Sequence, residues 1–157
     1  MWHLTAKQID SILTTVPENS RMLEWGSGEA SKKFIRSGVS LTSIEHNEAM
    51  QNTGGDFRLR LPVIRTHHTP QYMLDWSDYI QVPDIADFQT ILIDGECRGE
   101  CLAYVAHHNP DATVWLHDTQ RKLYGWATSM YETVQIVAGE DNHNNPNQLE
   151  QLRCIKP

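Results

Sequence analysis

Apolar runs alternate with segments of helical spacing along most of the chain, and several of the runs end in an acidic residue. Four short runs are typical of buried parallel strands: Arg21–Glu24, Leu41–Ile44, Phe88–Ile93 and Ala112–Leu116. Four segments carry apolar residues at helical spacing: Thr5–Val16, Ser31–Arg36, Gly99–His108 and Gln120–Tyr131. Thr5 and Gln8 stand at the positions of a capping box. This alternation predicts a parallel sheet with helices on both faces.

Other stretches give weaker patterns. Between Asn47 and Arg60 the apolar spacing is interrupted, so we expect a short irregular helix and a loop. Pro62–Thr66 indicates a short third strand. The segment His67–Asp84 is rich in aromatic and acidic residues, which is typical of a lid or ligand wall, although a surface loop with packed aromatic residues fits equally well.

The end of the chain predicts a closing hairpin. Thr133–Ala138 and Leu149–Ile155 have strand patterns, and the polar segment Glu140–Gln148 joins them. We therefore expect an α/β protein with an open, mostly parallel sheet of about seven strands and an antiparallel final hairpin. At 157 residues, positions 1–157 are expected to form one domain.

A glycine turn connects the first predicted strand to the helix that follows it. Gly26 and Gly28 accept backbone conformations closed to other residues and place no Cβ between the backbone and a ligand. The turn also presents free N–H groups and the positive end of a helix dipole. Glu24 ends the first strand and Glu45 ends the second, the position from which a carboxylate reaches ribose hydroxyls. This combination predicts a nucleotide-type cofactor site.

The segment Glu24-Trp25-Gly26-Ser27-Gly28-Glu29-Ala30 resembles the first motif of class I S-adenosylmethionine (SAM) dependent methyltransferases. That motif is an acidic residue followed by x-Gly-x-Gly-x-Gly, and Ala30 replaces the third glycine. The resemblance implies a Rossmann-like fold and SAM as cofactor. The residues that it implies hold SAM are Glu24, Gly26, Ser27, Gly28, Glu45 and His46. NAD or FAD is the alternative, but Ser31 stands where the Gly-x-Gly-x-x-Gly fingerprint requires its last glycine.

In the resembled family, the region that corresponds to His67–Asp84 touches adenine. Tyr72, Asp75 and Trp76 are the residues of this segment that the resemblance makes candidates for adenine contacts.

Two later segments resemble small O-methyltransferases, which carry an Ile-Asp-Gly and a His-Asp motif in these places. Here they read Ile93-Asp94-Gly95 and His117-Asp118. In metal-dependent O-methyltransferases, aspartates at these two positions hold a divalent cation, so the resemblance implies that Asp94 and Asp118 bind a metal such as Mg²⁺. The alternative is structural, with Asp118 capping the next helix and Arg98 pairing with a nearby acid.

The acceptor is expected to be a small molecule or a sugar, including a uronic acid. A hydroxyl is a poor nucleophile at neutral pH, so a metal or a positioned base must assist it. The catalytic candidates are Asp94, His117 and Asp118. The candidates for binding the substrate are Arg98, Arg121 and Tyr124. Two alternatives keep the same site: a SAM-binding protein without methyl transfer, and an enzyme that degrades SAM.

Composition narrows the range of expected binding partners and the expected cellular compartment. The formal charge is −7 and no basic run occurs, so nucleic acid is disfavoured as a partner. No stretch approaches the roughly 20 apolar residues of a membrane span, and the first residues do not resemble a signal peptide. Three cysteines suggest no disulfide framework, which favours a reducing cytoplasm. A homodimer is expected to supply missing walls of the substrate site.

Overall fold

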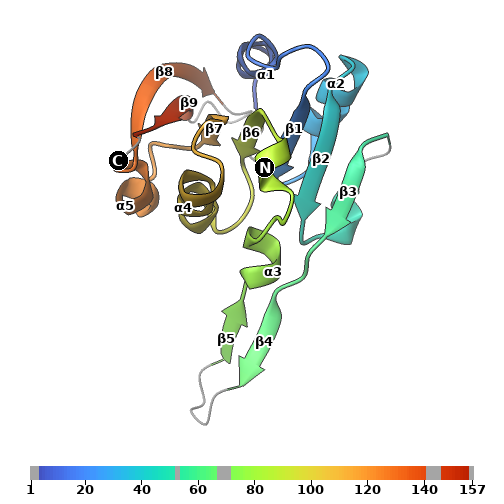
Figure 1. Ribbon diagram of the computed structural model, residues 1–157, viewed down its shortest axis with the longest axis vertical. Helices are drawn as coiled ribbons and strands as arrows, with labels where there is room; N and C mark the ends of the chain where they lie inside the picture. Colours follow the sequence, from blue (N-terminus) through green and yellow to red (C-terminus); the bar gives the residue numbers. More distant parts are fainter. Residues whose placement is uncertain (1–3, 52–53, 67–71, 141–145, 156–157) are drawn as a thin grey trace.

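A seven-stranded sheet forms the centre of the computed structural model, which describes residues 4–51, 54–66, 72–140 and 146–155 (Figure 1). The strand order is β3-β2-β1-β6-β7-β9-β8. The bounds of these strands are β1 Arg21–Trp25, β2 Ser40–Glu45, β3 Asp56–Leu59, β6 Thr90–Ile93, β7 Thr113–His117, β8 Tyr131–Glu140 and β9 Pro146–Cys154. Neighbouring strands in the series β3-β2-β1-β6-β7 pair in parallel, and β9 pairs antiparallel with both β7 and β8. The predicted fold class is confirmed.

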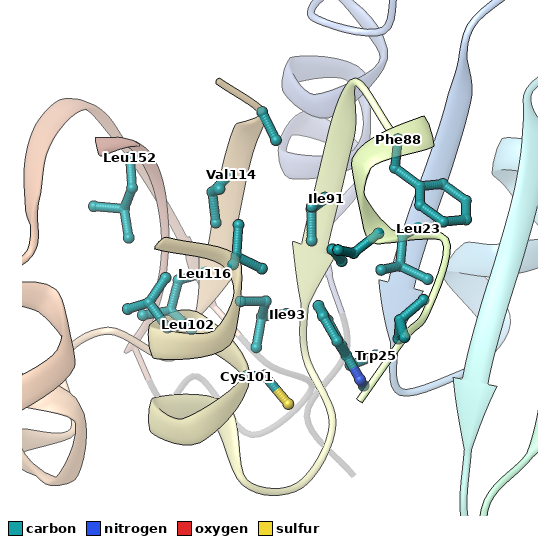
Figure 2. Packing of buried hydrophobic residues seen from close by; sticks show 14 of the residues in the cluster. Leu23, Trp25, Phe88, Ile91, Ile93, Cys101, Leu102, Val114, Leu116 and Leu152 are labelled. Carbon is teal, nitrogen blue, oxygen red and sulfur yellow. The ribbon is translucent and has the colours of Figure 1, made fainter. Parts of the chain in front are cut away.

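Helices cover both faces of the sheet because alternate residues of the central strands point to opposite sides. Ile91 and Ile93 of β6 pack with Leu102 of helix α4 (Arg98–His108), as Figure 2 shows. Leu92 of the same strand packs on the other face with the cluster that contains Ile12. That second face is covered by α1 (Ala6–Leu13) and α2 (Glu29–Arg36). Both faces of β6 are therefore buried, as its continuous apolar run predicts.

The first helix confirms the sequence signal at its start. The hydroxyl of Thr5 accepts a hydrogen bond from the backbone N–H of Gln8, and the side chain of Gln8 accepts one from the backbone N–H of Thr5. The amide of Gln8 also donates to Asn147 at 2.9 Å, so the helix is fastened to the final hairpin. The helix ends at Leu13, earlier than the predicted Val16.

The prediction for Asn47–Arg60 was wrong in part. The short 3-10 helix η1 (Glu48–Met50) matches it, but Asp56–Leu59 forms β3, an edge strand of the main sheet where a loop was expected. Asp56 is exposed and the other three side chains of β3 are only half-buried, which explains the weak apolar signal. Arg58 anchors the strand by two hydrogen bonds to the carboxylate of Asp84, at 2.7 and 2.9 Å.

The strand predicted over Pro62–Thr66 exists as β4 (Val63–Thr66), but it lies outside the main sheet. It pairs antiparallel with β5 (Tyr72–Asp75) in a separate two-stranded sheet. We call residues 61–66 and 72–75 the arm, and Figure 1 shows that its two strands, β4 and β5, extend away from the body. The chain then returns through the short helices α3 (Ser77–Ile80) and η2 (Ile85–Asp87).

The predicted helix Gln120–Tyr131 was also wrong in extent. The structure has a 3-10 turn, η3 (Lys122–Tyr124), and one helical turn, α5 (Gly125–Thr128). Tyr131 already belongs to β8, where it pairs with Cys154, and its buried hydroxyl donates to the carbonyl of Leu102 at 2.8 Å. Pairing with the last strand therefore overrides the helical spacing. In the described part of the chain, every helix is too short or too polar to cross a membrane.

Candidate active site

A cleft with a volume of about 730 Å³ opens at the carboxyl ends of the parallel strands, where the strand order reverses between β1 and β6. Ligands of open α/β sheets bind at this point, and the volume is typical of cofactor sites, which range over roughly 300–1,000 Å³. The wall is formed mainly by the glycine turn, the ends of β2 and β6, and two residues of the N-terminal segment, Leu4 and Ile9. The long loop after β7 adds Asp118 and Arg121.

Glu24 lies at the base of the cleft and is almost completely buried. One of its carboxylate oxygens, Oε1, accepts hydrogen bonds from the hydroxyls of Ser31 and Ser43, at 2.5 and 2.6 Å. Burial raises the pKa of Glu24 to about 8, although the two serine hydroxyls oppose this rise. The carboxyl group is therefore poised to lose a proton when a cation enters the cleft.

Glu45 holds the glycine turn in place. Its Oε2 accepts from the backbone N–H of Ser27 at 2.8 Å, and Oε1 accepts from the backbone N–H groups of His46 and Asn47 at 2.8 and 2.9 Å. Because a carboxylate oxygen has two acceptor sites, Oε2 has one left for a ligand hydroxyl. The ring of His46 lies edge-on to Trp76, with centroids 5.4 Å apart, and forms part of the cleft wall.

Gly26 and Gly95 bring the ends of β1 and β6 into backbone contact. Gly26 has a φ of +93°, and a Cβ added there would lie 2.7 Å from the Cα of Gly95. A Cβ at Gly95 would overlap the hydroxyl of Tyr79 and lie 2.8 Å from the nitrogen of Gly26. A Cβ at Gly28 would meet only the end of Met50, at 3.8 Å. The turn therefore needs Gly26 for close backbone packing, while Gly28 faces open space.

Asp94 and His117 form a pair at the ends of β6 and β7. Nδ1 of His117 lies 2.7 Å from Oδ1 of Asp94. Asp94 is partly exposed and lines the cleft, whereas the side chain of His117 is completely buried and does not line it. The second ring nitrogen of His117, Nε2, has no hydrogen-bond partner in the described structure and lies 3.9 Å from Oδ1 of Asp118.

Arg98 joins the two aspartates. Its guanidinium lies 3.3 Å from the carboxylates of both Asp94 and Asp118, and it donates to the backbone carbonyl of His117 at 2.7 Å. Arg121 contacts the completely buried Asp118 at 3.0 Å. The predicted alternative, in which Arg98 pairs with a nearby acid, is thus present as its contact with Asp94. Asp118 has a φ of +60°, and its carboxylate pairs with Arg98 and Arg121.

The expected divalent cation does not fit these residues. Among the described residues, no group of three or more His, Cys, Asp or Glu side chains is placed to hold a metal ion. The guanidinium of Arg98 takes the position between Asp94 and Asp118 that a cation would need, and its positive charge already compensates both carboxylates.

The cleft brings together most of the residues that the sequence predicts. Those in its wall are Glu24, Gly26, Ser27, Gly28, Glu45, His46, Asp94, Arg98, Asp118 and Arg121. His117 and Tyr124 are not in the wall; Tyr124 lies against Arg98, whose guanidinium is 5.9 Å from the ring centroid. Asp75 and Trp76 do not line the cleft, because Asp75 accepts hydrogen bonds from Ser77, whereas Trp76 packs against the core. The side chain of Tyr72 lies outside the described residues.

Sequence reasoning missed the two serines that hold Glu24. Ser31 carries a signal in hindsight, because it replaces the glycine of the dinucleotide fingerprint with a hydroxyl that bonds Glu24. Ser43 lies on β2, next to Glu24 in the parallel register, and only the pairing of the two strands reveals it. Lys33 and Met50 are further wall residues without a sequence motif.

Several solved structures of methyltransferases are similar in fold to this chain. A TehB-like SAM-dependent methyltransferase from Corynebacterium glutamicum has a TM-score of 0.60 at 11% identity, over 94% of this chain and 86% of that one. NodS, an N-methyltransferase of Bradyrhizobium japonicum in complex with S-adenosyl-L-homocysteine, has a TM-score of 0.60 at 12% identity, over 96% and 87%. The B. subtilis m1A22 tRNA methyltransferase TrmK has a TM-score of 0.56 at 13% identity, over 98% and 68%.

The chain therefore has the Rossmann-like fold of SAM-dependent methyltransferases. Neither a protein-family model nor the sequence of a curated protein matches it. At these low identities the likeness shows the fold, and the activity must be argued from the residues of the cleft.

Proposed function

We propose that the chain is a cytoplasmic SAM-dependent methyltransferase that methylates an oxygen of a small molecule or sugar, such as a uronic acid. One observation carries the proposal: Glu24 and Glu45, at the ends of two adjacent strands, line a single cleft above an open glycine turn. Structural neighbours bind S-adenosyl-homocysteine in a fold of this kind, which supports SAM as the cofactor.

The residues of the cleft suit the chemical groups of SAM. The remaining acceptor site of Glu45 Oε2 suits a ribose hydroxyl, and His46 supplies an aromatic edge beside it. Glu24 supplies a carboxyl group for the cationic end of the ligand. Gly28 lets the backbone approach the ligand closely, since little stands near it. The cofactor supplies an electrophilic methyl group.

On the acceptor side, Asp94 is the base that the geometry favours. Its Oδ1 is held by His117 and Arg98, and no described residue bonds its Oδ2. In the proposed reaction Oδ2 of Asp94 would accept the proton of the acceptor hydroxyl, and SAM held in the cleft would supply the methyl group to the acceptor oxygen. His117 is buried and is therefore a positioning residue for Asp94.

Arg121 is the candidate for holding an anionic acceptor, because it lines the cleft and its side chain is 40% exposed. Arg98 is only 12% exposed and fixes the ends of β6 and β7. Tyr124 packs beside Arg98 and would form the outer wall of the acceptor site. A metal has no role in this proposal.

Calorimetry with SAM, S-adenosyl-homocysteine and NAD tests the cofactor assignment. We expect the first two to bind in the micromolar range and NAD not to bind; binding of NAD alone would end the proposal. Mass spectrometry after incubation with panels of hydroxyl acids, sugars, amines and RNA then tests the acceptor. Methylated amines or methylated RNA among the products would contradict an oxygen of a small molecule as the acceptor. Loss of SAM without an acceptor would indicate SAM degradation.

Asp94→Asn tests the base once an acceptor is found. We expect kcat to fall by about a hundredfold or more, with SAM affinity retained. Asp78→Asn, at an exposed position on α3, is the matched control and should leave kcat unchanged. SAM binding without turnover on any acceptor would support a binding protein instead.

A further inference from the structure

The wall of the cleft includes an apolar part that lies outside the set of residues proposed to hold SAM. Leu4 and Ile9 line it from the N-terminal segment, and Leu92 lines it from β6. These three side chains are buried in one hydrophobic cluster, against which Ala30 of α2 also packs. This part of the cleft is therefore available for the acceptor.

Lys33 adds a positive charge to this apolar part. It lies one helical turn after Ala30 on α2, is exposed and lines the same cleft. Glu29 stands four residues before Lys33, a spacing that commonly gives an ion pair, but its Oε1 is bonded to Lys32 at 2.6 Å. In the described part of the chain, no carboxylate forms an ion pair with Lys33. Its ammonium group is therefore available to a ligand.

The carboxyl groups of the cleft wall repel an anion less than their number indicates. Asp94 and Asp118 are both compensated by the guanidinium of Arg98. Glu45 accepts three hydrogen bonds from backbone N–H groups, which spread its charge. Burial raises the pKa of Glu24 to about 8, so that this group is mostly neutral in the empty cleft at pH 7.

Arg121 supplies a second cation from the other side of Asp94. In the sheet, β6 lies between β1 and β7, while α2 follows β1 and Arg121 follows β7. The end of β6, which carries Asp94, therefore lies between the strand end that leads to Lys33 and the one that leads to Arg121. The ends of β1 and β7 are two strand spacings apart, roughly 10 Å. A guanidinium carries five N–H groups, so the contact of Arg121 with Asp118 does not prevent it from donating to a ligand.

We propose that the acceptor is a hydroxylated dianion, whose two anionic groups bind Lys33 and Arg121 and whose hydroxyl between them faces Asp94. This inference rests on the methyl transfer proposed above and names its substrate class. The class contains open-chain sugar dicarboxylates and sugar acids that carry a phosphate group. A molecule bound at both ends presents its middle to Asp94 in a fixed orientation, which favours reaction. Lys33 is then the residue that selects a dianion over a single acid.

An amine is the competing acceptor, because carboxyl groups are numerous in the wall. Lys33 and Arg121 argue against it, since both bring positive charge to the acceptor side of the cleft. Placing like charges together is costly in a binding site.

Calorimetry in the presence of S-adenosyl-homocysteine measures the effect of the second anion. D-glucarate has a carboxylate at each end of a six-carbon chain, D-gluconate has one, and D-sorbitol has none. We expect glucarate to bind at least about tenfold more tightly than gluconate, and sorbitol not to bind. Gluconate 6-phosphate tests a phosphate as the second anion. Tighter binding of either dianion supports the inference, whereas equal binding of both dianions and gluconate overturns it.

Lys33→Met tests which residue recognises the second anion. Because Lys33 is exposed, the circular dichroism spectrum and the affinity for S-adenosyl-homocysteine should not change. We expect the difference in affinity between dianion and gluconate to disappear. Arg36→Met is the matched control, since Arg36 is an exposed cation of the same helix that does not line the cleft. An equal loss of dianion binding in both variants would show a general effect of charge and contradict the role of Lys33.

The same titrations, repeated without S-adenosyl-homocysteine, separate this inference from the proposed activity. If S-adenosyl-homocysteine binds and neither dianion does, the inference fails and the cofactor assignment stands. If a dianion binds in a manner that depends on Lys33 and S-adenosyl-homocysteine does not bind, the anion site stands and methyl transfer fails. Tighter binding of 1,6-diaminohexane than of either dianion would overturn the inference in favour of a cationic acceptor.

Discussion

Replacing Glu24 by Gln should change how the stability of the chain depends on pH. The carboxyl group is buried, and its pKa rises from an ordinary value of 4.5 to about 8. The folded chain therefore binds this proton more tightly than the unfolded chain. The resulting stabilisation is fully present below pH 4.5 and is lost as the pH rises to about 8. Since each pKa step is worth about 1.4 kcal/mol, the loss amounts to about 5 kcal/mol at most.

Urea unfolding at pH 5, 7 and 9 measures this effect. The native chain should lose several kcal/mol of unfolding free energy over this interval relative to Glu24→Gln, whose neutral amide does not titrate. Glu29→Gln is the matched control, because Glu29 borders the same cleft but is exposed and pairs with Lys32 at 2.6 Å. Parallel pH profiles for the native chain and Glu24→Gln would refute the assignment of a buried, protonated Glu24.

Three further substitutions test other parts of the site and core. Gly95→Ala should destabilise the chain by about 2–4 kcal/mol in urea unfolding, because a Cβ there overlaps neighbouring atoms, whereas Gly125→Ala, with open space around it, should not. Glu45→Ala should weaken SAM binding at least about tenfold in calorimetry, while the exposed Glu48→Ala should leave it unchanged. Asn109→Ala should lower the thermal midpoint markedly, since its buried amide donates to two carbonyls at 2.8 Å, and an unchanged midpoint would contradict this.

Local sequence signals were sufficient for the buried strands and poor for the edges. The run Phe88–Ile93 identifies β6 because both faces of that strand are buried, so the consecutive positions Ile91, Leu92 and Ile93 are all apolar. Asp56–Leu59 gives no such run, since β3 is an edge strand held by pairing with β2 and by Arg58. Pro62–Thr66 was predicted as the third strand of the sheet, but β4 lies in a separate two-stranded sheet, because strand spacing does not reveal which strand is the partner.

The acidic strand ends of the site could be predicted for a similar reason. Glu24, Glu45, Asp94 and Asp118 each follow an apolar run, and parallel strands bring their ends to one edge. Their individual roles depend on contacts across the sequence. The insertion of Arg98 between two aspartates, and the complete burial of His117, arise only when β6 and β7 lie side by side.

The backbone contact between Gly26 and Gly95 has a consequence for how such a chain diversifies. Because no side chain separates the two strand ends, the glycine turn and the carboxylate of Asp94 are held in place by the same backbone contact. In the proposed methyltransferase, a change in this backbone contact that suited a new acceptor would misplace the bound SAM as well. Selection for new acceptors would therefore act on the peripheral segments, which are the arm and the loop after β7, while the backbone contact between Gly26 and Gly95 stays unchanged.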